Sequence, residues 1–251
     1  MRSALKLSPA RLLGATFLLA LAACDKAATT STAATGTGDA AVAAPADGNW
    51  LAVTAATPEG GFRIGNPDAR VKLLEFASLT CPHCKDFEAE AMDTIRNKYV
   101  ASGNVSYEFR NFVLNGPDFA ASLLARCQGP DQFFALLTSF FQDQESWTKP
   151  FMTIAPAEQT RIGALPQDQQ IAAMATAGQL DAYVRTRGIP KAKFDQCLTD
   201  KAQMDRIEAL RKEATDTYKL TGTPGFVING QTQDGVFTWA DLEPKLQAAL
   251  R

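Results

Sequence analysis

The chain has 251 residues, of which 46% are apolar and 21% are charged, a composition typical of a globular protein with one large domain or two small ones. Its formal net charge is −2, and removing the residues before Cys24 leaves 27 acids against 22 bases, a net charge of −5. This balance does not support nucleic-acid binding, which needs a basic face to replace phosphate counterions.

Residues 1–23 have the features of a lipoprotein signal peptide. Basic residues precede a short apolar run, 12–20, which is too short to span a bilayer comfortably as a helix. The run leads into Leu-Ala-Ala-Cys, which resembles a bacterial lipobox with Cys24 as the lipidated first residue of the mature protein. The alternative is an ordinary export signal, with Cys24 left as a free thiol.

A free N-terminal thiol is a liability in an oxidising compartment, so lipidation of Cys24 is the favoured interpretation. Asp25 follows directly and resembles an inner-membrane retention signal of enterobacterial lipoproteins. We therefore expect a periplasmic protein that is lipid-anchored, with the inner membrane favoured. Residues 24–59 are rich in Ala and Thr and are expected to form a disordered tether.

The expected folded domain, 60–251, begins with a strand, a helix and a second strand. Residues 71–78 are mostly apolar, as in a strand buried on both faces. A helix is expected to start around Cys81, with Pro82 at its first position. After Gly103, residues 105–109 alternate as a second strand. This order predicts a βαβ unit with a parallel strand pair.

A helical insertion is expected over about 116–200, followed by a long helix that continues to about Leu220. Within the insertion, the phenylalanine-rich run 133–141 is dense enough to be core rather than an exposed substrate surface. The chain returns to a strand at 225–228. The following Asn-Gly pair predicts a hairpin turn, with a partner strand near 236–237 and a closing helix capped by Thr238.

Without the insertion, the predicted elements are β-α-β and then α-β-β-α, an α/β arrangement of the thioredoxin type. A Cys-x-x-Cys motif after a strand, an upstream acid and a Thr-Pro pair before the hairpin resemble the DsbA-like branch of the thioredoxin superfamily; these are Cys81-Pro82-His83-Cys84, Glu75 and Thr223-Pro224. The resemblance covers roughly 61–250. It implies a thioredoxin fold with an inserted helical domain.

Cys81 is expected to be the reactive cysteine, because a helix N-terminus favours thiolate over thiol. Cys84, one turn further in, is expected to be less exposed and to resolve or re-form the disulfide. A Cys-x-x-Cys motif can also bind zinc, but structural zinc needs four ligands. This chain offers one such motif and one histidine inside it, so no metal is expected.

His83 is the only histidine, and its position between the cysteines allows it to stabilise the Cys81 thiolate by charge or hydrogen bond. A stabilised reduced form makes the disulfide a better oxidant. The alternative is a solvated surface histidine beside an ordinary motif.

For the remaining site residues, composition and resemblance lead to different expectations. By composition, a lone acid such as Glu75 lies at a strand edge or in solvent; the resemblance implies a buried residue that relays the proton of Cys84. By composition, Thr223-Pro224 is a turn before a strand. The resemblance implies that Pro224 is cis and faces Cys81, and that the backbone of Thr223 binds an extended substrate.

Cys81, Cys84, Cys127 and Cys197 allow three pairings, and spacing alone does not choose among them. Cys127 and Cys197 both fall on apolar helix faces of the insertion, and we expect a structural disulfide between them. Two buried free thiols are the alternative.

The resulting expectation is an enzyme that oxidises paired thiols of exported proteins through a mixed disulfide at Cys81. It needs no cofactor, and a membrane partner such as a DsbB-like quinone-linked oxidase would reoxidise it. An isomerase or reductase supplied by a transmembrane electron donor is a second hypothesis, motivated by Thr223 and the lipid anchor. A tethered peptide-binding chaperone is a third, against which the intact motif argues.

Overall fold

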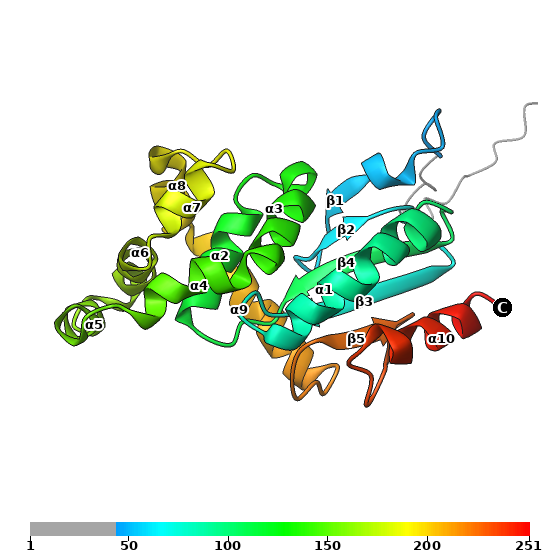
Figure 1. Cartoon of the computed structure of the whole chain (residues 1–251). Coiled ribbons are helices and arrows are strands. Elements are labelled where there is room, and N and C mark those ends of the chain that lie inside the picture. The colour runs from blue at the N-terminus through cyan, green and yellow to red at the C-terminus, as the bar shows by residue number, and fades with distance from the viewer. Residues whose placement is uncertain (1–43) are drawn as a thin grey trace, which may run out of the picture. The chain divides into compact units, whose positions relative to one another are not determined.

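The computed structural model describes residues 44–251 (Figure 1). The expected signal peptide, the lipidation site Cys24 and the first part of the expected tether lie outside the described residues.

The strands of residues 44–251 form one six-stranded mixed sheet in the order β1-β2-β4-β3-β5-β6. Their bounds are Thr54–Ala56 (β1), Phe62–Ile64 (β2), Val71–Ala77 (β3), Val105–Asn111 (β4), Gly225–Ile228 (β5) and Gln231–Thr232 (β6). β3 and β4 run parallel over seven residue pairs, and the other neighbours are antiparallel. The predicted βαβ unit is therefore confirmed, and its first strand is central in the sheet.

Both faces of β3 are buried, which explains its nearly continuous apolar sequence. Leu73 and Ala77 face the main core, whereas Leu74 and Phe76 belong to a smaller cluster on the opposite face. Because side chains alternate along a strand, Glu75 shares the face of Leu73 and Ala77. The strand therefore carries an acidic side chain into the main core.

Helices cover both faces of the sheet. α1 (Pro82–Thr94) continues into the π-helix η2 (Ile95–Val100) and packs on the main core with α10 (Trp239–Ala249), while α9 (Lys201–Asp216) reaches the smaller cluster. Among the described residues, no helix combines the length and apolar character needed to cross a membrane.

The expected insertion contains the helices between β4 and α9. They are α2 (Gly116–Arg126), α3 (Pro130–Gln142), α4 (Gln144–Met152), α5 (Pro156–Gly163), α6 (Gln167–Ala177), α7 (Leu180–Arg185) and α8 (Lys191–Cys197). Figure 1 shows them at the end of the sheet where β3 and β4 finish, which is also where α1 begins. The phenylalanines of α3 are buried, so the prediction that they belong to the core is confirmed.

The ordered fold starts earlier than the sequence suggested. Residues expected to belong to the tether form the 3-10 helix η1 (Trp50–Ala52) and strand β1, which pairs with β2. Trp50 packs against Gly103, where a Cβ atom would lie 2.4 Å from the indole nitrogen. Gly103 also has a φ of +74°, so both the close indole ring and the backbone conformation favour glycine here. The prediction that the tether extends to residue 59 was therefore wrong.

The hairpin after β5 is also tighter than predicted. Asn229 and Gly230 both have positive φ and form a two-residue turn, so the partner strand β6 starts at Gln231. Among the described residues, no strand forms near Val236. This residue lies in a loop, and its side chain is buried in the core. Thr238 caps α10 by accepting a hydrogen bond from the Asp241 backbone, as expected.

Candidate active site

The motif cysteines lie at the start of α1. Cys81 has an extended backbone and occupies the N-cap position, and Pro82 starts the helix, where its missing N–H costs no hydrogen bond. Cys81 is 6% exposed and Cys84 is fully buried, and both are free thiols in this structure. This is the division expected between an attacking and a resolving cysteine.

The surroundings of Cys81 lower the pKa of its thiol to about 5. The largest cause is a hydrogen bond from the Cys84 thiol, which favours the Cys81 thiolate. The Thr223 side chain and the backbone N–H groups of Cys84 and His83 act in the same direction, while burial opposes them. These N–H groups are the unpaired donors of the first helical turn, so the position at the helix start contributes directly.

The pKa of Cys84 is raised well above its ordinary value, first by burial and then by Cys81 and Glu75. The two cysteines are therefore shifted in opposite directions. Once Cys81 is reduced it remains a thiolate at neutral pH, whereas Cys84 binds a proton.

Glu75 lies beneath the cysteines with 2% of its surface exposed. Burial raises the pKa of its carboxyl group to about 8, and the charges of Glu88 and Cys81 act in the same direction. Tyr107 opposes the shift, because its hydroxyl donates a 2.6 Å hydrogen bond to the Glu75 carboxylate. Glu75 therefore carries a proton at neutral pH, close to the resolving cysteine.

Two residues near Glu75 were missed in the sequence. Tyr107 is on β4, fully buried, and its partner in the parallel register is Leu73. The alternation of residues 105–109 places Tyr107 on a buried face, and a tyrosine on the strand predicted to pair with the strand of Glu75 was the available signal. Glu88 lies one turn after Cys84 on α1; it is buried, accepts a hydrogen bond from Thr138, and burial raises the pKa of its carboxyl group.

Thr223 and Pro224 face Cys81 from the other side. The peptide bond between them is cis, and they directly precede β5. The Cys81 sulfur lies 3.4 Å from the Thr223 backbone carbonyl, to which it donates when protonated. The structure therefore brings the bend that leads into β5 next to the reactive sulfur.

Pro82 and His83 are exposed at the surface beside Cys81. His83 contributes its backbone N–H to the environment of Cys81. Any charge effect of its imidazole remains a prediction.

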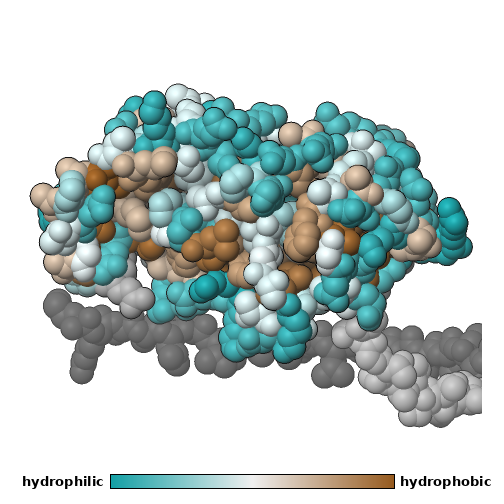
Figure 2. All heavy atoms as spheres, turned by 60° about the horizontal axis from the view of Figure 1, so that its bottom comes forward, coloured by the Kyte–Doolittle hydropathy of each residue, from teal (hydrophilic) through white to brown (hydrophobic). Residues whose placement is uncertain are grey.

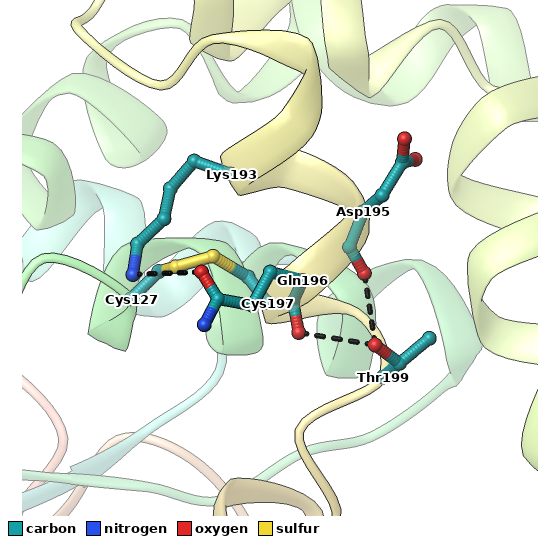
Figure 3. The surroundings of a disulfide bond; sticks show 6 residues. All are labelled: Cys127, Lys193, Asp195, Gln196, Cys197 and Thr199. Atoms are coloured by element: carbon teal, nitrogen blue, oxygen red, sulfur yellow. Dashed lines mark hydrogen bonds between the residues drawn. A yellow bond between two sulfur atoms is a disulfide. The ribbon is translucent and has the colours of Figure 1, made fainter.

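Cys127 and Cys197 are joined by a disulfide within the insertion, with their Cα atoms 5.7 Å apart (Figure 3). Cys127 is the C-cap of α2 and Cys197 is the last residue of α8. Figure 3 shows Lys193 beside the bond, with its amine donating to the Gln196 side chain over 3.3 Å. The bond connects the first and last helices of the insertion.

Within residues 44–251, no group of three or more acidic, cysteine or histidine side chains is arranged to hold a metal ion.

The exposed large apolar residues of the same range are Leu114, Met152 and Phe237. Figure 2 shows one face of the molecule, on which apolar residues form separate patches between hydrophilic ones.

Comparison with known proteins places this site in a family. A family model described as Thioredoxin matches residues 57–248, which is most of the chain. The chain belongs to the thioredoxin family. A solved structure of a protein-disulfide isomerase from Novosphingobium aromaticivorans is 33% identical, with a TM-score of 0.71, and the match covers 75% of this chain and 96% of that one.

Solved structures with a similar fold include a DsbA protein. The structure of alpha-DsbA1 from Wolbachia pipientis has a TM-score of 0.61 over 78% of this chain and 93% of that one; at 22% identity it supports the fold alone. A Rickettsia bellii protein named "Putative protein-disulfide oxidoreductase" is 26% identical over 184 residues, 72% of this chain. The match spans 62% of that relative, less than two thirds of its length. The chain is a thioredoxin-family protein with a DsbA-like fold.

Proposed function

We propose that this protein oxidises paired thiols of exported proteins by transferring the Cys81–Cys84 disulfide to them. The observation that carries the proposal is the opposite shift of the two pKa values, to about 5 for Cys81 and well upward for Cys84. A stabilised Cys81 thiolate favours the reduced enzyme, and a favoured reduced form makes its disulfide an oxidant.

In the proposed reaction, a substrate thiolate attacks the Cys81 sulfur of the oxidised protein. The Cys81–Cys84 bond breaks, a mixed disulfide forms at Cys81, and Cys84 leaves with the electron pair. A second substrate thiolate then attacks the substrate sulfur and releases Cys81. The substrate gains a disulfide, and the enzyme gains two electrons. Cys81 is a good leaving group because its pKa is low.

Glu75 has a defined role in this sequence. Cys84 leaves as a thiolate in a buried place where the thiol is strongly favoured. Glu75 carries a proton at neutral pH because its pKa is about 8, so it can protonate Cys84 at that moment. When the disulfide is re-formed, the same carboxylate accepts the proton back.

The proposed location follows from the sequence outside the described residues. Residues 1–23 direct export, Cys24 carries the lipid, and the following residues tether the folded domain to the membrane, with Asp25 favouring the inner one. Anchoring raises the local concentration of the enzyme near a membrane partner. We assign reoxidation to a DsbB-like oxidase. Replacing Cys24 by Ala should move the protein from the membrane to the soluble fraction; retention in the membrane would contradict the anchor.

The activity is tested with the full-length oxidised protein and an unfolded substrate that has two reduced cysteines. We expect one substrate disulfide to form for each enzyme disulfide lost, counted by alkylation and mass analysis. Unchanged substrate thiols, with Cys81–Cys84 still oxidised, would contradict the proposal.

A second candidate is disulfide isomerisation. The structure from Novosphingobium aromaticivorans, at 33% identity, carries the name of an isomerase, and Thr223 was the sequence feature that suggested this direction. A substrate with wrongly paired disulfides separates the two functions. An isomerase restores its native pairing when supplied in the reduced form, whereas an oxidase acts only on reduced substrate.

A further inference from the structure

The short loop between β3 and α1, residues 78–80, is held by side chains of the helical insertion. Asp118 on α2 is fully buried and accepts hydrogen bonds from the Ser78 hydroxyl at 2.5 Å and the Leu79 backbone N–H at 3.0 Å. Asn115, the N-cap of α2, donates to the Thr80 hydroxyl at 2.9 Å. A carboxylate is rarely buried unless its oxygens accept hydrogen bonds, so Asp118 depends on these donors of the loop for its buried position.

A second contact comes from the first residue of α4. The Gln144 side chain is buried, and its amide donates to the backbone carbonyls of Leu79 and Cys81, both over 2.9 Å. One amide group thus fixes the two carbonyls that flank the Thr80–Cys81 peptide bond. Beside it, Lys85 of α1 forms an ion pair with Glu145 at 2.9 Å.

Both contacts hold groups that adjoin the backbone facing the reactive sulfurs. The backbone of Ser78 forms a hydrogen bond to the Cys84 sulfur, and the N–H groups of His83 and Cys84 face the Cys81 sulfur. If the carbonyls of Leu79 and Cys81 were free to turn, the peptide groups next to them would turn as well. The donors around the two sulfurs would then lose their alignment.

We propose that Gln144 and Asp118 are positioning residues, through which the helical insertion holds the β3–α1 loop and thereby sets the reactivity of Cys81 and Cys84. The hydrogen bonds of both side chains to the loop go to its backbone and to the Ser78 hydroxyl, so each residue acts through the loop. The inference rests on the proposed function in one respect, since it concerns the same dithiol. It gives the insertion a chemical role in addition to any contact with substrate.

The test compares Gln144→Leu with Gln142→Leu in the full-length protein. Gln142 has the same side chain two residues earlier, at the end of α3, but is exposed, which makes it the matched control. Two quantities are measured: the pKa of Cys81, from thiolate absorbance against pH, and the equilibrium constant of the dithiol with glutathione. We expect Gln144→Leu to raise the pKa of Cys81 by at least half a unit, about threefold in its ionisation constant. The glutathione equilibrium should shift at least threefold towards the enzyme disulfide.

Gln142→Leu should change neither quantity. If Gln144→Leu lowers the melting temperature but leaves both quantities at the wild-type values, the role of Gln144 is structural only and the proposal is overturned. Should that variant fail to fold, Asp118→Asn provides the second test, because it keeps the side-chain volume and removes the charged acceptor of the Ser78 hydroxyl. A wild-type glutathione equilibrium for a folded Asp118→Asn variant would overturn the proposal too.

This experiment distinguishes failure of the proposed oxidase function from failure of the positioning role. The equilibrium constant of the wild-type protein decides whether the dithiol is an oxidant, as proposed above. The ratio between variant and wild type decides whether the insertion positions it. A wild-type protein that behaves as a reductant, with a threefold effect of Gln144→Leu, would reject the oxidase and retain the positioning role.

Discussion

The two cysteine pairs of the described chain lie at opposite ends of helices. Cys81 is the N-cap of α1, where backbone N–H groups face its sulfur. Cys127 is the C-cap of α2, and Cys197 ends α8, so both lie at the negative end of a helix dipole. The helix dipole favours a thiolate at the first place and disfavours it at the second.

This difference separates a reactive pair from a structural one without any change of residue type. A thiolate that is stable in the folded protein makes its disulfide easy to reduce, and a thiolate that is unstable there makes the disulfide persist. Sequence separation also favours a persistent disulfide at the structural pair. Cys127 and Cys197 are 70 residues apart, whereas the motif cysteines are three apart. Closing the longer loop restricts the unfolded chain more strongly.

The largest expected effect is the loss of thiol exchange in a Cys81→Ala variant. Without the nucleophilic sulfur, no mixed disulfide forms, so oxidation of a dithiol substrate should fall by at least about 100-fold, to the uncatalysed rate. The double variant Cys127→Ala/Cys197→Ala should keep the wild-type rate. The measurement is the appearance of substrate disulfide over time. Full activity of Cys81→Ala would remove the distinction between the pairs and contradict exchange at Cys81.

The second effect concerns stability and belongs to the other pair. Replacing Cys127 and Cys197 by Ala should lower the free energy of unfolding by about 3–5 kcal/mol on the loop-entropy model. Chemical denaturation of the two proteins, with Cys81 and Cys84 reduced in both, measures the difference. The glutathione equilibrium of Cys81–Cys84 serves as the control and should not move. A double variant as stable as the wild type would show that the bond does not stabilise the insertion.

The third effect is a pH dependence that comes from Glu75. The folded protein keeps the Glu75 proton up to about pH 8, whereas an unperturbed carboxyl group loses it near 4.5. The stability associated with this proton is fully present below pH 4.5 and is lost as the pH rises through 8. Glu75→Gln should therefore gain stability relative to wild type over this window, by on the order of a few kcal/mol. Denaturation midpoints at several pH values measure it; a constant difference would contradict the raised pKa.

The smallest effect is expected for Lys85→Met. Lys85 lies one turn after Cys81 and pairs with the exposed Glu145 across the boundary with the insertion. Because exposed ion pairs contribute little, the melting temperature and the pKa of Cys81 should stay at their wild-type values. A clear rise in the Cys81 pKa would show that a nearby charge, rather than the helix start, sets this pair apart.

The sequence predicted those parts of the site whose residue types also determine the local secondary structure. Cys81 and Pro82 predicted the helix start, and the apolar run around Glu75 predicted a buried strand. The resemblance to DsbA-like proteins supplied what local pattern could not, because the burial of Glu75 depends on which strands lie beside β3. The edge strand β1 was missed because three small residues carry little signal, and its order depends on pairing with β2.

Contacts between distant segments were beyond sequence reasoning. Tyr107 bonds to Glu75 only through the register of two parallel strands. Asp118 and Gln144 reach the loop before Cys81 from helices 40 and 63 residues away from their partners. As residue types, an aspartate and a glutamine near helix starts are ordinary, so only the packing of the insertion identifies them.

The most direct test is a glutathione titration of the full-length protein, with both cysteine pairs followed by alkylation and mass analysis. The account predicts a reduction potential for Cys81–Cys84 above about −200 mV, well above the thioredoxin value of about −270 mV, while Cys127–Cys197 stays closed throughout. A potential for Cys81–Cys84 at or below about −270 mV, or opening of both pairs together, would contradict it.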